Sequence, residues 1–193
     1  MNSALNHPLW LSARAVLRAI IKVSLGAGGR LKVRRGSGLP RQARPLIVVS
    51  NHPSLMDTVY YSCALTPPVT VCGAKPRYFS SVASRTLMRL GNVMRVEGHA
   101  QYVADCTRLL EQGRILLTFP EMGRQPQGVG PFSAWTAEVA LRTAVPILPC
   151  HIRHAAGKTR QAVITVGEEF LASGTADALA VQMRERIMAL ENS

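Results

Sequence analysis

The chain has 193 residues, of which 47% are hydrophobic, so it is long enough for one domain with a substantial core. Lys and Arg (23) outnumber Asp and Glu (11), and the formal net charge is +12. This charge predicts an anionic partner such as nucleic acid, anionic lipid or a phosphorylated substrate. Aromatic residues make up only 5% of the chain and no base-stacking motif is present, so we do not expect nucleic acid to be the partner.

The four cysteines are scattered and form no Cys-x-x-Cys pair. We see no secretory signal with a cleavage site. The pattern therefore predicts reduced, mostly buried thiols in a cytosolic compartment, and no zinc site. The four are Cys63, Cys72, Cys106 and Cys150.

Residues 8–25 are rich in bulky apolar residues, lack acids, and carry three cations at every fourth position. That spacing places the cations on one face of a predicted helix. Three central cations argue against a transmembrane span, whereas Trp10 near the start favours an amphipathic helix lying in the membrane interface. A basic surface helix packed on the domain is the alternative. The cations are Arg14, Arg18 and Lys22.

The chain therefore divides into a basic membrane-associating segment at 1–30 and a folded domain at 31–193. In that domain strands and helices alternate, which predicts the α/β class: a single domain with a central mixed sheet flanked by helices. Strands are expected at 31–34 (an edge strand), 46–50, 69–73, 93–96, 114–119, 145–150 and 161–166. Helices are expected at 54–65, about 78–90, 99–112, 132–143 and 175–191, with loops at 35–45 and 120–131.

The strand at 46–50 runs into Asn51-His52-Pro53-Ser54-Leu55-Met56-Asp57. Pro53 should stop the strand, and Ser54 with Asp57 forms a capping-box-like helix start. His52 then lies at a strand-to-helix turn, within reach of Asp57. A carboxylate beside an imidazole fixes its tautomer and favours its protonated form, as a general base needs. In the alternative interpretation Asp57 only caps the helix, and His52 is a turn histidine.

Three further blocks follow. Arginine offers planar recognition of phosphate, and glycine lets backbone amides approach a ligand closely. Two of the blocks combine these residue types at strand ends, and the third is an apolar strand bracketed by prolines. The blocks are Gly91-Asn92-Val93-Met94-Arg95, Phe119-Pro120-Glu121-Met122-Gly123-Arg124 and Val145-Pro146-Ile147-Leu148-Pro149.

In this order, the blocks from Asn51 to Pro149 resemble the glycerolipid acyltransferase family, whose best-known members are lysophosphatidic acid acyltransferases. The resemblance implies that His52 is the general base and Asp57 its partner. It also implies an acyl-CoA or acyl carrier protein thioester as co-substrate, no bound cofactor or metal, and work at the cytoplasmic face of the cell membrane. It places the substrate-binding residues at Asn51, Arg95, Glu121, Gly123 and Arg124.

Two departures from the family pattern lie in the acceptor-binding blocks. Met122 stands where the family has glycine, and Arg95 follows Gly91 more closely than usual. The acceptor therefore stays open between a lysophospholipid such as 1-acyl-glycerol-3-phosphate, another lysolipid and a specialised metabolite. The alternative from another class is a non-catalytic basic protein that binds anionic membrane or RNA. His151 and His154 have no acid or cysteine at ligand spacing, so we expect surface residues at a strand end.

Overall fold

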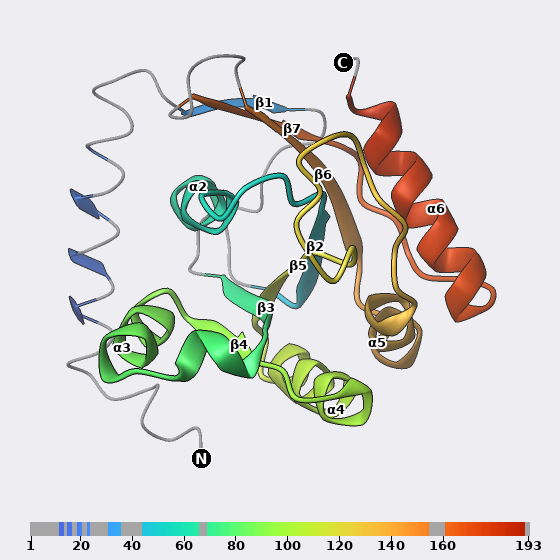
Figure 1. Cartoon of the computed structure of the whole chain (residues 1–193). Helices are drawn as coiled ribbons and strands as arrows, with labels where there is room; N and C mark the ends of the chain where they lie inside the picture. Colours follow the sequence, from blue (N-terminus) through green and yellow to red (C-terminus); the bar gives the residue numbers. More distant parts are fainter. Residues whose placement is uncertain are drawn as a thin grey trace.

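The computed structural model describes residues 31–35, 44–65, 69–154 and 161–191, together with residues 12–13, 15–16, 19–20 and 23. These residues form an α/β domain in which helices lie on both faces of one seven-stranded mixed sheet (Figure 1). The predicted fold class is confirmed.

The strand order is β1-β7-β6-β2-β5-β3-β4, so β2 lies inside the sheet and β1 lies at its edge, as predicted. Every neighbouring pair is parallel except β6 and β7, which makes the sheet mixed. The parallel strands between β6 and β4 all end at the same edge, where ligands bind in open α/β sheets. The strands are β1 (Leu31–Arg35), β2 (Leu46–Ser50), β3 (Thr70–Ala74), β4 (Val93–Arg95), β5 (Ile115–Thr118), β6 (Ile147–His154) and β7 (Ala162–Val166).

Within residues 31–193 every predicted helix is present, but three start differently from the prediction by more than one residue, among them the helix expected over 132–143, which begins at Trp135. The helix expected from Ser54 begins at Asp57, and the helix expected over 78–90 is broken into a 3₁₀ turn and α3. The break lies at Ser81, whose extended backbone and hydroxyl cap α3 by accepting from the Ser84 N–H. The helices are α2 (Asp57–Ala64), η2 (Pro76–Phe79), α3 (Val82–Leu90), α4 (His99–Glu111), α5 (Trp135–Thr143) and α6 (Ala176–Ala189).

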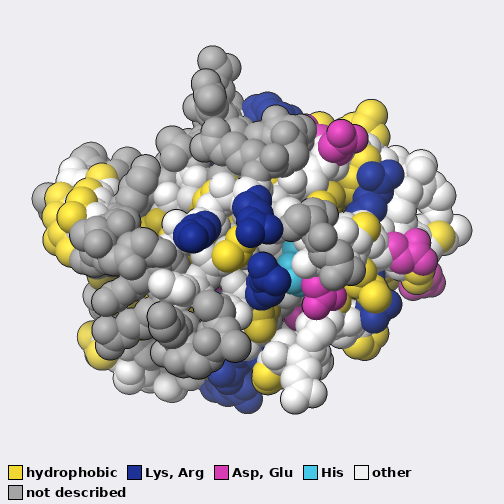
Figure 2. Space-filling view, turned by 90° about the horizontal axis from the view of Figure 1, so that it is seen from above, with side chains coloured by type: hydrophobic (Ala, Val, Ile, Leu, Met, Phe, Trp, Pro, Cys, Tyr) yellow, Lys and Arg dark blue, Asp and Glu magenta, His cyan; other side chains and the backbone are white. Residues whose placement is uncertain are grey.

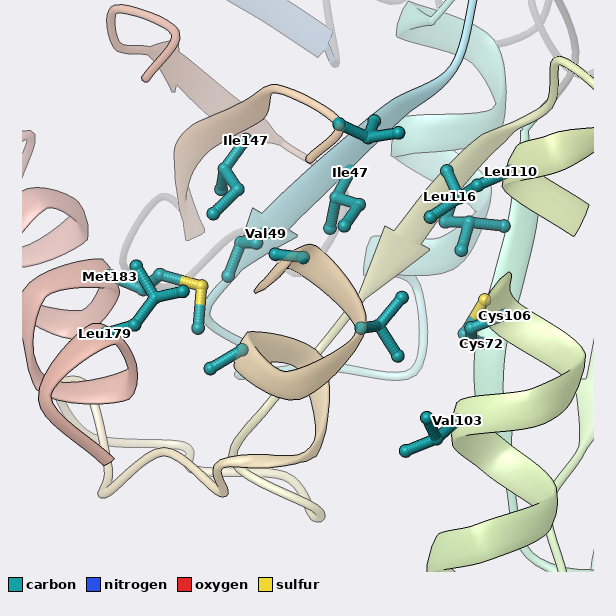
Figure 3. Packing of buried hydrophobic residues seen from close by; sticks show 14 of the residues in the cluster. Ile47, Val49, Cys72, Val103, Cys106, Leu110, Leu116, Ile147, Leu179 and Met183 are labelled. Carbon is teal, nitrogen blue, oxygen red and sulfur yellow. The ribbon is translucent and has the colours of Figure 1, made fainter. Parts of the chain in front are cut away.

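Two hydrophobic clusters hold the helices to the sheet, because successive strand side chains point to opposite faces. In β2, Ile47 and Val49 face α4, α5 and α6 (Figure 3), whereas Leu46 and Val48 face α2. All four side chains are completely buried, as the apolar run predicts. Because β2 is buried on both faces, the position of its last residue is fixed. The candidate site begins directly after that residue.

The predicted membrane-associating segment at 1–30 lies mostly outside the described residues. The positions that are described within it are helical, and Val16, Ile20 and Val23 are exposed. In the described parts of the chain, we find no helix with the length and apolar character needed to cross a membrane. The division into 1–30 and 31–193 stays a prediction. The four cysteines are free and buried, which agrees with the prediction of buried thiols.

Candidate active site

His52 lies just beyond the end of β2, at the edge where the parallel strands end. Its Nδ1 is 2.9 Å from Oδ2 of Asp57, the first residue of α2. The Asp57 side chain is completely buried, whereas the His52 side chain is 15% exposed. With its proton on Nδ1 donated to Asp57, His52 keeps Nε2 free to accept another proton.

Asp57 also organises the turn that carries His52. Its Oδ2 accepts a second hydrogen bond, 2.8 Å long, from the backbone N–H of Ser54. Met56, the residue before α2, gives no side-chain cap. The two interpretations of Asp57 are therefore compatible, because one oxygen contacts both the imidazole and a backbone amide at the helix start.

His154 completes the surroundings of this carboxylate. Its Nε2 lies 2.6 Å from Asp57 Oδ1, and its side chain is 19% exposed. The expectation that His151 and His154 are surface residues is wrong, because His151 is only 5% exposed and His154 binds a buried acid. The error has a physical cause: β6 continues to His154, four residues past its predicted end.

Two groups from the segment after β5 contact His52. The Phe119 ring stacks on the imidazole with centroids 4.1 Å apart and planes 19° apart. The Glu121 carboxylate accepts the His52 backbone N–H at 2.8 Å and the Gly130 N–H at 2.8 Å. Burial raises the pKa of Glu121, and these two N–H donors oppose the rise. Glu121 thus ties the histidine turn to the loop that follows β5.

Asn51 ties the same turn to β6. Its Nδ2 donates to the Ile152 carbonyl at 3.0 Å, and its Oδ1 accepts the Ile152 N–H at 2.8 Å. Asn51 is 3% exposed, so this amide pair replaces strand pairing where β2 has ended. The side-chain polar atoms of Asn51 and Glu121 are engaged with backbone, and their predicted substrate-binding role stays a prediction.

A basic group gathers near the histidine turn. Arg124 is exposed and precedes Gln125, whose N–H donates to the His52 carbonyl at 3.0 Å. The pKa of Tyr78 is lowered, first by a hydrogen bond from Arg77 and further by the positive charges of Arg77 and Arg124. On the face shown in Figure 2, several Lys and Arg side chains gather on one side of a histidine, and acidic side chains lie on another side of it. The arrangement suits an anionic ligand.

Arg95 lies farther from the histidine turn. It ends β4, and β5 and β3 separate β4 from β2, which puts the two strands roughly 14 Å apart at about 4.8 Å per strand. Its guanidinium pairs with Glu97 at 2.7 Å. The predicted role of Arg95 in acceptor binding stays a prediction, while Arg77 and Tyr78 are site neighbours that sequence reasoning missed.

The backbone of the loop after β5 explains a departure from the family pattern. Met122 has φ +55°, a left-handed conformation that glycine adopts readily and other residues adopt at a cost. The glycine of this chain, Gly123, is exposed, and no atom would lie within 4 Å of a Cβ placed on it. The backbone at position 122 therefore has the left-handed conformation that suits the family's glycine, although methionine occupies the position in this chain.

A hollow beside Phe119 leads from this edge toward α4 and α5. It is lined by residues from the ends of β3 and β5 and by residues of α4 and α5, among them Lys75, Tyr102 and Trp135. Its surface is mostly apolar. Within the described ranges, no group of His, Cys, Asp or Glu is suited to holding a metal ion.

Taken together, the fold and the site define an α/β domain that presents a carboxylate-oriented histidine at the carboxyl edge of parallel strands. The model of the acyltransferase family matches residues 30–153, and the chain belongs to this family. The resemblance found in the sequence blocks is thereby confirmed.

Among solved structures, the fold is similar to that of PlsC, the 1-acyl-sn-glycerophosphate (LPA) acyltransferase of Thermotoga maritima. The TM-score is 0.70 over 93% of this chain and 80% of that one, with 19% identical residues. At this identity the likeness concerns the fold. No curated protein matches the chain.

Proposed function

We propose that the protein transfers a fatty acyl group from a thioester donor to the hydroxyl of a lysophospholipid, with His52 as the general base. The observation that carries the proposal is the hydrogen bond from His52 Nδ1 to the buried Asp57 carboxylate. It leaves Nε2 as the nitrogen that can take a proton from an acceptor hydroxyl at the open edge of the sheet. Histidine is the side chain most often used as a general base.

In the proposed reaction, the acceptor oxygen attacks the thioester carbonyl carbon while its proton passes to His52 Nε2. The negative charge of Asp57 stabilises the imidazolium that forms. The tetrahedral intermediate then collapses, the carbon–sulfur bond breaks, and His52 returns the proton to the leaving sulfur. The products are an ester and a free thiol. No covalent acyl-enzyme is required.

Charge near the site supports an acceptor that carries phosphate, such as 1-acyl-glycerol-3-phosphate. Arg77 and Arg124 both lower the pKa of Tyr78, and Arg124 precedes Gln125, whose N–H donates to the His52 carbonyl. Guanidinium groups bind phosphate in a bidentate way. If the acceptor is another lysolipid or a specialised metabolite, His52 would still be the base. Arg77 and Arg124 would then pair with a different group of the acceptor. The acyl donor is an acyl-CoA or an acyl carrier protein thioester.

We further propose that the protein works at the cytoplasmic face of the cell membrane and that residues 1–30 attach it there. The exposed Val16, Ile20 and Val23 share helical spacing, which supports an apolar helix face. Deleting residues 1–26 should therefore reduce co-sedimentation with anionic vesicles. Equal sedimentation of the full-length and shortened proteins would contradict this attachment.

The activity is tested by measuring free thiol released from acyl-CoA, or from acyl carrier protein, with and without each candidate acceptor. We expect release that depends on the acceptor and is fastest with 1-acyl-glycerol-3-phosphate. The matched control is His99→Ala, which removes a half-exposed histidine outside the site. This variant should release thiol at the wild-type rate. If no donor and acceptor pair gives acceptor-dependent release, the proposal fails, and a non-catalytic basic protein becomes the better interpretation.

A further inference from the structure

We infer that His154 is a positioning residue that acts through Asp57 on His52, an inference that rests on the proposed function. His154 does not contact the reacting atoms in this arrangement. It binds the carboxylate oxygen that His52 leaves free, so that Asp57 lies between two imidazoles. Neither the sequence blocks nor the family resemblance gave His154 a role.

The topology explains how His154 reaches Asp57. β2 and β6 pair in parallel register, with Ser50 opposite Cys150, but β2 ends at Ser50 while β6 continues. Cys150, Ile152 and His154 alternate with their neighbours and point to one face of the sheet. Cys150 and Ile152 pack in the cluster that contains α2 side chains, so His154 points toward the same helix, of which Asp57 is the first residue.

The two oxygens of the Asp57 carboxylate accept hydrogen bonds from different donors. Oδ2 receives hydrogens from His52 and Ser54, whereas Oδ1 receives the hydrogen of His154 Nε2. Asp57 has no exposed surface, so bulk water does not reach Oδ1 to replace this donor. A buried carboxylate oxygen without a donor is costly, and the carboxylate would turn to find one.

Turning the carboxylate would disturb His52. The plane of the Asp57 carboxylate decides whether Oδ2 meets His52 Nδ1 along its N–H direction. His154 holds that plane from the opposite oxygen. Loss of this hold should weaken the stabilisation of the His52 imidazolium, which forms during proton transfer and not during substrate binding. The change should therefore lower kcat and leave both KM values nearly unchanged.

The competing interpretation is that His154 only joins the end of β6 to the start of α2. That role predicts a loss of stability with normal turnover in the folded protein. The Tyr60 ring, 5.8 Å from His154 between centroids, shows that the imidazole also packs against α2. The two interpretations therefore need a readout of catalysis that stability alone does not change.

A first experiment compares two substitutions. His154→Gln keeps an N–H near the position of Nε2, whereas His154→Leu keeps the bulk and removes the donor. We expect kcat to fall about tenfold in His154→Leu with both KM values within about twofold, and to be largely retained in His154→Gln. The size of the effect is taken from metal-ligating histidines, whose orienting partners commonly contribute about 10- to 100-fold. Equal kcat in wild type and His154→Leu would overturn the inference.

A double-substitution cycle tests whether the effect passes through Asp57. In an Asp57→Asn background the oriented carboxylate is already lost, so adding His154→Leu should change kcat by less than about twofold. An undiminished tenfold fall in that background would contradict action through Asp57.

Nitrogen-15 NMR of the histidine rings tests the inference without relying on turnover. In its neutral form, wild-type His52 should carry its proton on Nδ1, the nitrogen that faces Asp57. His154→Leu should shift the His52 ring nitrogen resonances, whereas His99→Leu should not. If the wild type releases no thiol but this shift is seen, the proposed function fails while the positioning contact stands. If the His52 resonances are the same in wild type and His154→Leu, the inference is overturned.

Discussion

At the scale of single residues, the Asp57 carboxylate binds both the side chain of His52 and the backbone at the start of α2. Its Oδ2 accepts from the ring of His52 and from the backbone of Ser54, so the oxygen that orients the imidazole also organises the start of α2. A change at this oxygen should therefore affect both stability and activity, but to very different extents.

Asp57→Asn should separate the two effects. The amide oxygen can still accept from backbone N–H groups, so we expect the unfolding free energy to change by about 1 kcal/mol. Turnover should fall by about 100-fold or more, because the neutral amide does not stabilise an imidazolium and allows the wrong His52 tautomer. Thermal unfolding and kcat measure the two effects. A large loss of stability with full turnover in the folded fraction would favour helix capping as the main role.

Met122→Gly should stabilise the protein. Met122 and Ala144 both have φ above +50°, where a Cβ is unfavourable. We expect an increase in unfolding free energy of about 0.5–1 kcal/mol for Met122→Gly and for Ala144→Gly, as measured in denaturant. Ala178→Gly, in the regular helix α6, is the control and should cost about 1 kcal/mol. A fall in stability for both left-handed sites would contradict the argument.

At the scale of elements, much of the arrangement could be predicted because local signals agree with the packing. The apolar run of β2, the glycine after α4 and the helix signals after each strand are readable from neighbouring residues. Gly113, with φ +76°, ends α4 where the sequence predicts a stop. The His52–Asp57 contact belongs to this group, since only five positions separate the residues.

The parts that could not be predicted depend on partners distant in sequence. The extension of β6 to His154 follows from pairing with β7, so the contact between His154 and Asp57 has no local signal. The same holds for Asn51, whose amide binds the backbone of Ile152, and for the distance of Arg95, which is set by strand order. A sequence block shows which residues follow one another, but only the sheet order shows which ones meet.

Arg124 and Arg95 should differ in their effect on acceptor binding. Arg124→Ala should raise the KM for a phosphate-bearing acceptor about tenfold or more and leave the donor KM nearly unchanged, because charged hydrogen bonds contribute about 1.5–3 kcal/mol. Arg95→Ala should have the smaller effect, because Arg95 pairs with Glu97 at the edge of the sheet. Steady-state kinetics with both substrates varied gives the answer. Equal KM changes for donor and acceptor in Arg124→Ala would indicate a structural role.

At the scale of the whole molecule, histidines on the two faces of β6 affect different properties. His154 faces α2 and the candidate site. His151 lies on the opposite face and is buried. Burial lowers the pKa of His151, with Glu191 opposing the shift and Arg153 adding to it. The folded protein therefore resists protonation at this position more than the unfolded chain does.

Global stability should depend on pH through His151. As pH falls through about 6.5, the unfolded chain takes up a proton before the folded protein does, so the unfolding free energy falls on acidification toward the lower folded-state pKa. We expect a shallower decrease between about pH 7 and 5 for His151→Gln than for wild type. Near pH 8 the two proteins should differ only by a constant cost. Parallel curves across the whole range would contradict a buried neutral His151.

The central claim, that His52 carries out acyl transfer to a lipid acceptor, is tested most directly by mass spectrometry of lipid extracts. Extracts are compared from cells that express the wild-type chain and cells that express His52→Ala at equal folded amounts. We expect an acylated lipid that accumulates with wild type and falls by about 100-fold or more with His52→Ala, because a general base contributes roughly 10²–10⁴-fold. The same acylated product at the same level from both chains would contradict the account.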